Sequence, residues 1–209
     1  MRERKDNNHI EKEPIQPQIE IYCGPMFSGK SSQLITELRR APYAGLKVIA
    51  FTPFVDNRRK KDTINSDDGA SYPAITVKSS KEILDYILPE HDIVGIDEGN
   101  FFDMDLPLVC KYLVLKEKKV IVAGLDKNFK GEPFGPMGIL KQEAETVHTL
   151  HAFCTVCHRK ASFTQRLKII SGQKVPADYN DPLILIGAEE AYEARCRQHH
   201  EVPGRPEYE

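Results

Sequence analysis

Short apolar runs alternate with amphipathic stretches between residues 18 and 123. The apolar runs predict β-strands over 18–23, 47–52, 92–97 and 120–123. Helical periodicity predicts helices over 29–40, onward from the capping-box sequence at Ser79, and over 105–118. Continuous apolar strands that alternate with helices form a parallel sheet that helices cover on both faces. The pattern therefore predicts an α/β fold.

The rest of the chain lacks this alternation. Residues 52–73 are polar and predict a mobile surface loop. After about Thr146, we expect β segments over 148–153 and 162–170 around a cysteine-bearing turn, and then a long loop over 171–182. These shifts divide the chain into a flexible tail, a main α/β domain, a small second domain and a C-terminal tail, over 1–17, 18–146, 147–200 and 201–209.

Composition narrows the class of protein. The 209 residues are 40% hydrophobic and 29% charged, enough apolar residues for a core. The 29 basic and 31 acidic residues nearly balance, which argues against a general binder of nucleic acid or of membrane surfaces. The longest apolar runs are strand-sized, and the charged N-terminus is not followed by a hydrophobic segment. We therefore expect a soluble cytoplasmic protein.

The strongest motif is Gly24-Pro25-Met26-Phe27-Ser28-Gly29-Lys30-Ser31, which fits G-x-x-x-x-G-K-[ST] between a predicted strand and a predicted helix. In such a loop, backbone N–H groups and the helix N-terminus surround phosphate oxygens. Lys30 is predicted to neutralise the β- and γ-phosphates, and Ser31 to bind Mg²⁺. The main domain is thus predicted to be a P-loop NTPase-like nucleotide-binding domain.

A carboxylate pair follows the apolar run at 93–96. Asp97 is at the expected place of the carboxylate that holds Mg²⁺ directly or through water. Strand alternation points Glu98 away from Asp97, toward an acceptor, where it would act as a general base. If Glu98 activates water, the protein is an ATPase, and if it activates a bound hydroxyl, the protein is a kinase. These two motifs do not decide between them.

Two closely spaced residue pairs are candidate metal ligands: Cys154-x-x-Cys157 and Cys196-x-x-His199. Each pair presents two ligands to one point, as a tetrahedral structural Zn²⁺ requires. His199 or the adjacent His200 completes the set, and the spacing favours His199. A thioredoxin-type redox pair would open a helix after a strand, and no such helix is predicted. The second domain therefore has the pattern of a small zinc ribbon.

Aromatic residues collect after the predicted strands, at Phe101, Phe102, Phe129, Phe134 and Tyr192. A planar base stacks on such rings. Core packing is the better interpretation for Phe102.

Four blocks in this order closely resemble the type II thymidine kinases, the cellular and bacterial class. They are the P-loop, residues 96–102, the Gly124-Leu-Asp to Pro-Phe-Gly135 region and the paired cysteine knuckles, and the match runs over 19–200. The resemblance implies transfer of the γ-phosphoryl group of ATP to the 5′-hydroxyl of deoxythymidine, a salvage step for DNA synthesis. Glu98 falls on the family's catalytic base.

The resemblance also assigns further residues. It implies that residues 24–31 and 97–100 bind ATP, so Gly99 and Asn100 join the residues already named. It also places Asp56 and Arg58 near the phosphates and Mg²⁺. Around the thymine, it implies Met26, Leu125, Phe129, Phe134 and Thr164. The family's substrate lasso, whose backbone would read the base, falls on Leu183, Ile184, Leu185, Ile186 and Gly187, together with Tyr192.

The family comparison further implies structural zinc on the knuckles, a homotetramer and inhibition by dTTP. Asn100 departs from the family's usual Gln, and His199 from the Cys of some members. Three competing hypotheses stay open: a nucleic-acid-dependent ATPase with DNA-binding knuckles, a nucleotide sensor without turnover, and a kinase that prefers deoxyuridine or deoxycytidine.

Overall fold

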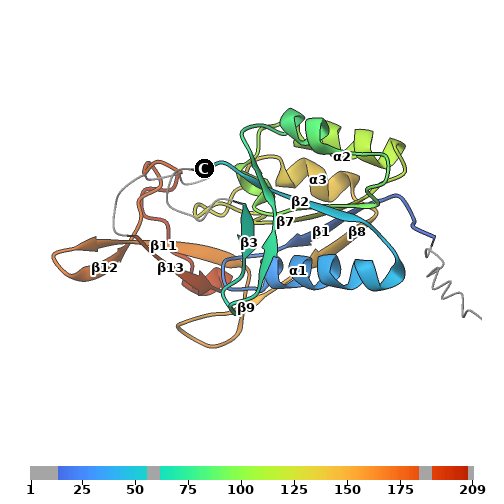
Figure 1. Ribbon diagram of the computed structural model, residues 1–209. Coiled ribbons are helices and arrows are strands. Elements are labelled where there is room, and N and C mark those ends of the chain that lie inside the picture. Colours follow the sequence, from blue (N-terminus) through green and yellow to red (C-terminus); the bar gives the residue numbers. More distant parts are fainter. Residues whose placement is uncertain (1–13, 56–61, 184–189, 207–209) are drawn as a thin grey trace, which may run out of the picture.

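The computed structural model describes residues 14–55, 62–183 and 190–206 of the chain. Six strands form one parallel sheet in the order β5-β2-β6-β7-β1-β8 (Figure 1). The strands are β1 (Ile19–Cys23), β2 (Val48–Pro53), β5 (Ile75–Val77), β6 (Ile93–Ile96), β7 (Lys119–Gly124) and β8 (Thr146–Thr149). The predicted α/β sheet is confirmed. Because β8 pairs with β1, part of the β segment expected from residue 148 belongs to this sheet.

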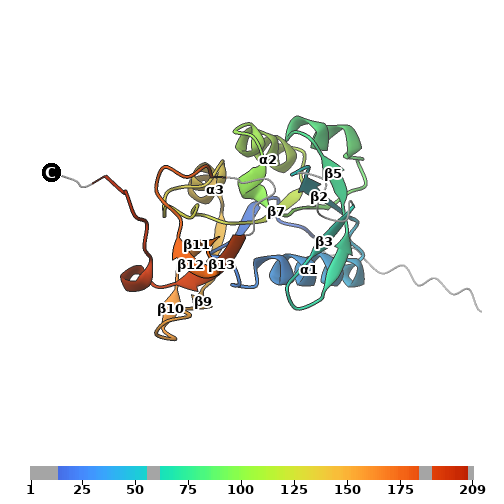
Figure 2. The ribbon, with the colours of Figure 1, turned by 90° about the vertical axis from the view of Figure 1, so that its left-hand side faces the viewer.

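Three α-helices cover the sheet from both sides. Helix α1 (Lys30–Arg40) lies on one face, and α2 (Leu106–Leu115) and α3 (Met137–Glu143) lie on the other (Figure 1, Figure 2). Four 3-10 helices are also described, η1 (Ala41–Ala44), η2 (Lys81–Tyr86), η3 (Gly99–Phe101) and η4 (Arg197–His199). No helix of the described ranges is long and apolar enough to cross a membrane.

Strand β7 shows how the sequence builds the two layers. Ile121 and Ala123 pack in the core beneath α1, whereas Val120 and Val122 pack in the core beneath α2 and α3. Successive side chains of a strand point to opposite faces, so an unbroken apolar run serves both cores. Phe102 is buried in the second of these cores, as its packing interpretation predicted.

Two helices differ from the sequence expectation. The helix expected over 105–118 ends at Leu115, and the Asp105 side chain does not cap it but pairs with Lys81 at 2.8 Å. The stretch after Ser79 forms a 3-10 helix, η2, although the backbone N–H of Glu82 donates to Ser79 Oγ at 3.4 Å as a capping box requires. The local capping signals thus predicted where both helices start, but not where α2 ends or that η2 is a 3-10 helix.

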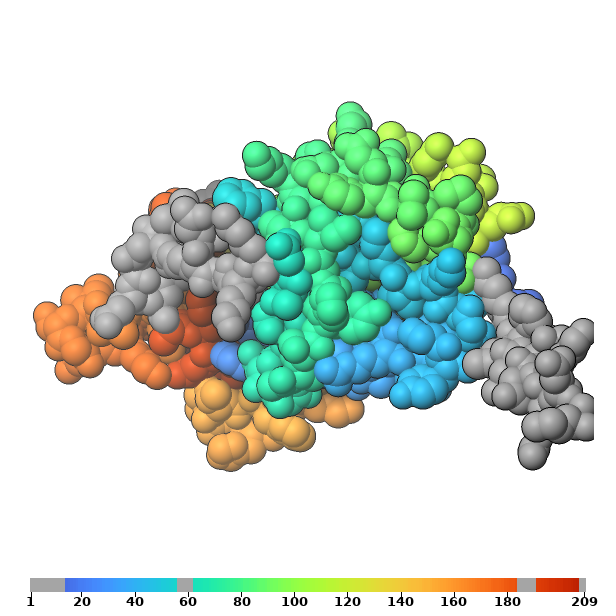
Figure 3. Space-filling view, in the orientation of Figure 1, coloured from blue at the N-terminus to red at the C-terminus, as the bar shows by residue number. Residues whose placement is uncertain are grey.

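The prediction of a surface loop over 52–73 is wrong for the second half of that range. Strands β3 (Thr63–Asn65) and β4 (Ser71–Pro73) pair as an antiparallel hairpin. Ile64 is buried in the core beneath α1, and the hairpin covers the side of that helix in the space-filling view (Figure 3). One buried side chain in a three-residue strand is too short a pattern to recognise beside so many polar neighbours.

A second module lies at the carboxyl ends of the sheet strands (Figure 1). Its main part is a three-stranded antiparallel sheet of β12 (Gln173–Pro176), β11 (Phe163–Ile170) and β13 (Glu190–Arg195). The long loop expected over 171–182 therefore contains a strand, because residues 173–176 pair with the end of β11. The short hairpin of β9 (Ala152–Phe153) and β10 (Lys160–Ala161) carries the first cysteine pair.

Candidate functional site

The P-loop connects β1 to α1 with a geometry that its glycines permit. A Cβ on Gly24 would lie 2.4 Å from the Leu150 carbonyl oxygen, and Gly29 has a φ of +80° at the start of α1. Inside the loop, Ser28 Oγ and Lys30 Nζ donate to the Pro25 carbonyl oxygen at 2.8 and 2.7 Å. The loop is thus closed on itself with the Lys30 ammonium group at its mouth.

Asp97 lies beside the P-loop at the end of β6. Ser31 Oγ donates to Asp97 Oδ1 at 3.0 Å, which brings together the two side chains predicted to bind Mg²⁺. Burial and the charge of Glu98 raise the pKa of Asp97 to about 7. Burial lowers the pKa of Lys30, and the nearby Glu98 and Asp97 carboxylates oppose that shift. The three charged groups therefore form one electrostatic unit.

Glu98 differs from the expected strand geometry. It has a left-handed φ of 52°, outside β6, so strand alternation does not govern its direction. Asp97 and Glu98 both border the same cavity, rather than opposite sides of a strand. A left-handed conformation of a non-glycine residue stores strain and is found often at functional sites.

These groups border a cavity of about 920 Å³ between the main sheet and the second module. One part of the lining, the P-loop end, includes the P-loop residues Phe27, Gly29, Lys30 and Ser31. Another part of the lining, the aromatic end, includes Met26, Phe101, Leu125, Phe129, Phe134, Thr164, Leu183 and Tyr192. Phe101 and Phe134 meet edge to face with ring centroids 5.4 Å apart. Residues from five distant parts of the sequence thus form one apolar, aromatic end.

Other predicted site residues lie elsewhere. In the described part of the chain, the cavity lining omits Gly24, Pro25, Ser28, Gly99 and Asn100. Asn100 is buried, and its Oδ1 accepts the backbone N–H of Leu125 at 2.8 Å. The side chain therefore fixes the backbone of a cavity-lining residue. Asp56, Arg58, Ile184, Leu185, Ile186 and Gly187 lie outside the described residues.

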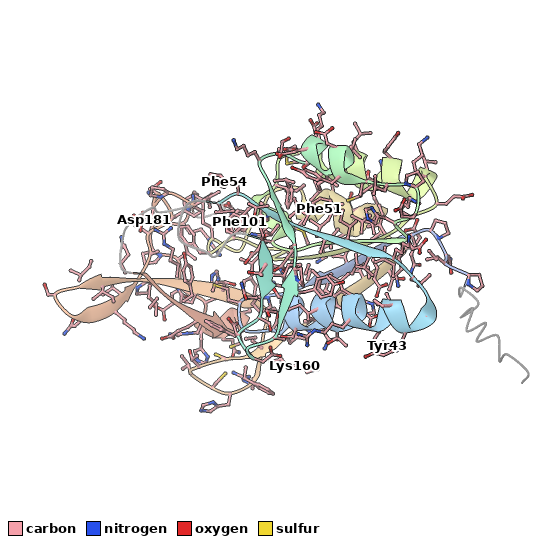
Figure 4. The ribbon with its side chains drawn as sticks, viewed as in Figure 1. Tyr43, Phe51, Phe54, Phe101, Lys160 and Asp181 are labelled. Atoms are coloured by element: carbon pink, nitrogen blue, oxygen red, sulfur yellow. The ribbon has the colours of Figure 1, made fainter. Side chains whose placement is uncertain are left out.

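The β3–β4 hairpin supplies residues to the cavity that the sequence interpretation missed. Its lining includes Thr63, Asn65, Ser66, Asp67 and Asp68, together with Phe54 and Val55 after β2. Phe54 lies at the same end of the sheet as Phe101 (Figure 4). The available signal was the Asp-Asp-Gly turn after Thr63-Ile64-Asn65, a hairpin pattern that the surrounding charges obscured.

The two cysteine pairs converge into one cluster. The ligand atoms of Cys154, Cys157, Cys196 and His199 all lie within 4.8 Å of one another. Cys157 Sγ is 3.7 Å from Cys196 Sγ, and His199 Nδ1 is 3.6 Å from Cys154 Sγ. With metal–ligand bonds of ~2.0–2.3 Å, neighbouring atoms of a tetrahedral Zn²⁺ site are about 3.6–3.8 Å apart. The cluster is therefore compatible with structural zinc.

The local environment also favours the thiolate that zinc requires. Burial opposes ionisation of Cys154, but backbone N–H groups of Cys196 and Cys157 lower its pKa to about 5. The Arg159 Nε–H group donates to Cys157 Sγ at 3.4 Å. The surrounding core contains only small residues, Ala152, Ala161 and Ala194, so packing alone gives this hairpin little support.

His200 lies apart from this cluster. Its Nε2 is 2.8 Å from the Phe129 carbonyl oxygen, and its ring stacks on Phe163 at 4.7 Å. The geometry therefore assigns His199, not His200, to the fourth position of the cluster.

Comparisons with known proteins give one family match and several similar solved structures. A sequence model of the family described as thymidine kinase matches residues 17–200. Among solved structures, the chain is similar to the flagellar accessory protein FlaH from Methanocaldococcus jannaschii, at 14% identity and a TM-score of 0.46, over 79% of this chain and 78% of that one. It is also similar to the Legionella pneumophila ATPase DotB, at 14% identity and a TM-score of 0.39, over 70% of this chain and 44% of that one. The family match spans most of the sequence, and the chain belongs to the thymidine kinase family.

Proposed function

We propose that the protein transfers the γ-phosphoryl group of ATP to the 5′-hydroxyl of deoxythymidine and releases thymidine 5′-monophosphate and ADP. The observation that carries this proposal is a single cavity with Glu98 beside Lys30 at one end and an aromatic, apolar wall at the other. Such a cavity suits two substrates, one presenting phosphates and one presenting a planar base. Family membership favours thymidine as the acceptor.

At the phosphate end, the P-loop backbone and Lys30 bind and orient the triphosphate. Ser31 and Asp97 offer hydroxyl and carboxylate oxygens 3.0 Å apart, the ligand type that Mg²⁺ prefers. These two residues would hold the ion that accompanies ATP, which when bound offsets negative charge on the phosphate oxygens. Arg58, which lies outside the described residues, is proposed to assist there.

Glu98 acts as the general base in this proposal. Its carboxylate accepts the proton of the 5′-hydroxyl while that oxygen forms a bond to the γ-phosphorus, and the bond from phosphorus to the ADP oxygen breaks. The left-handed backbone of Glu98 and its place in the cavity lining support this role. Little covalent work is required of the protein, so orientation of the two substrates supplies most of the rate.

At the other end, the base is proposed to lie among Met26, Leu125, Phe129, Phe134 and Thr164. Leu183 and Tyr192 line the same end, on either side of residues 184–189. Specificity for thymidine over deoxyuridine rests on one methyl group, worth ~1–3 kcal/mol in a fitted pocket.

A phosphorylation assay with ATP·Mg²⁺ and each of the four deoxynucleosides, plus deoxyuridine, tests the substrate. We expect thymidine to have the highest kcat/KM. Turnover of another nucleoside with thymidine unreacted would refute the substrate assignment, and ATP hydrolysis stimulated by DNA but indifferent to thymidine would favour the competing ATPase hypothesis.

Two further properties rest on family resemblance alone. We expect a homotetramer, which sedimentation analysis measures, and inhibition by dTTP, which steady-state kinetics measures.

A further inference from the structure

Arg166 is a fully buried cation in the second module. It lies on β11, two residues after the cavity-lining Thr164, and its exposed fraction is 0%. Removing a charged guanidinium group from water is costly unless its contacts compensate. An apolar side chain of similar length would fill the same space without that cost. The position therefore uses the chemistry of the guanidinium group and not only its volume.

The guanidinium group contacts two parts of the cavity wall at once. Its carbon lies 4.9 Å from the centroid of the Phe129 ring, within cation–π range. Its Nη1 donates to the Pro182 carbonyl oxygen at 2.5 Å, one residue before the cavity-lining Leu183. Arg166 is thus a bridge between the wall formed by Phe129 and the chain that leads into residues 184–189.

Other contacts hold each end of this bridge. The Phe129 carbonyl oxygen is 2.8 Å from His200 Nε2, which fixes the residue from its backbone side. The segment that ends at Pro182 is tied to β11 by an ion pair between Lys168 and Asp181 at 2.7 Å. Neither of these two contacts joins Phe129 to the segment at Pro182, whereas the Arg166 side chain contacts both.

We propose that Arg166 is a positioning residue for the nucleoside. Arg166 holds the Phe129 ring at a fixed distance from the chain at Pro182, and this distance sets the width of the aromatic end of the cavity. This inference rests on the proposed function, because it presumes that the aromatic end receives the nucleoside. Arg166 is not among the lining residues and acts through Phe129 and Leu183. Neither of these two contacts involves a P-loop residue, so we expect ATP binding to change little when Arg166 is replaced.

The test compares Arg166→Met and Arg166→Lys with the wild type. Met fills a similar volume without charge, and Lys keeps the charge without the planar fork. Lys174→Met is the matched control, because it removes an exposed cation from β12 of the same sheet. We expect Arg166→Met to raise KM for thymidine at least about tenfold, the loss of one charge-assisted contact, with KM for ATP changed less than twofold. Arg166→Lys should recover part of the loss, and Lys174→Met should match the wild type.

Thermal unfolding gives a second measurement without turnover. Thymidine should raise the unfolding temperature of the wild type and of Lys174→Met more than that of Arg166→Met, whereas ATP should stabilise all three equally. A wild type that is stabilised by thymidine but transfers no phosphoryl group would refute the proposed function alone. Equal stabilisation of Arg166→Met and the wild type by thymidine, or a parallel rise in both KM values, would overturn the role of Arg166.

Discussion

Thr164 Oγ1 accepts the backbone N–H of Met26 at 3.0 Å. This hydrogen bond joins the P-loop to β11 of the second module. Both residues line the cavity, so the bond holds the P-loop against the second module where the two meet in the cavity wall. In the proposed reaction such a link would help to position the two substrates, because a displacement of about 1 Å costs ~10²-fold in rate.

Removal of this acceptor should impair the reaction with little change in fold. Thr164→Val keeps the shape of the side chain but cannot accept the Met26 N–H group, and we expect kcat/KM for thymidine to fall about tenfold. Thr164→Ser keeps the hydroxyl and should stay within about threefold of the wild type. Steady-state kinetics measures both, and equal activity of the valine variant and the wild type would contradict this link.

Glu98→Gln should separate chemistry from binding. The amide cannot accept the hydroxyl proton, so we expect kcat to fall about 10²–10⁴-fold, the range for loss of a general base. ATP should still bind, as calorimetry measures. Glu90→Gln, a substitution at a surface carboxylate paired with Lys47, is the matched control and should leave kcat unchanged. Near wild-type turnover of Glu98→Gln would refute the role of base.

Metal content tests the cysteine–histidine cluster. We expect one equivalent of zinc in the purified protein, as mass spectrometry of the metal measures, and loss of that zinc in Cys196→Ser. Because the hairpin core contains only alanines and the cluster itself, loss of zinc should lower the unfolding temperature.

The control for this experiment is Cys110→Ala. Cys110 lies on the buried face of α2, and burial raises its pKa to about 12, so it has no thiolate to offer a metal. This variant should keep its zinc. A wild type purified without zinc, whose unfolding temperature equals that of Cys196→Ser, would contradict the structural site.

Glu20 gives the stability a defined pH dependence. Burial raises the pKa of its carboxyl, but hydrogen bonds from Lys119 and Tyr22 and the charge of Lys119 together lower it by more, so the net pKa lies below its usual 4.5. A lowered folded-state pKa contributes stability that is present above pH 4.5 and lost as the pH falls through the folded-state value. Denaturant titrations should show the wild type more stable than Glu20→Gln at pH 7, with the difference shrinking below pH 4.5. A difference independent of pH would contradict this assignment.

Local sequence patterns were sufficient to predict the candidate site residues that lie on consecutive or closely spaced positions. The P-loop between β1 and α1, and Asp97 and Glu98 after β6, follow from strand and helix patterns that need no partner to recognise. The cysteine–histidine set followed from short spacings, and the structure brings its four ligand atoms together.

Contacts between distant segments were not predictable in the same way. Strand β11 has three consecutive polar residues, Thr164-Gln165-Arg166, a pattern that does not predict burial, yet all residues from Phe163 to Leu167 are buried. Gln165 is covered because its amide exchanges two hydrogen bonds, both at 2.8 Å, with the backbone of Glu201, and Arg166 is covered by Phe129 and Pro182. The sequence pattern of one strand does not predict which distant segments pack on it. The Asn100 contact with Leu125 was missed for the same reason.

The central claim is that Glu98 and the P-loop act on two substrates in one cavity, and product stoichiometry tests it most directly. With ATP·Mg²⁺ and thymidine, chromatography should show thymidine 5′-monophosphate and ADP in equal amounts, with no free phosphate, and neither product from Glu98→Gln above about 1% of the wild-type rate. ADP and free phosphate without a thymidine phosphate would contradict the account.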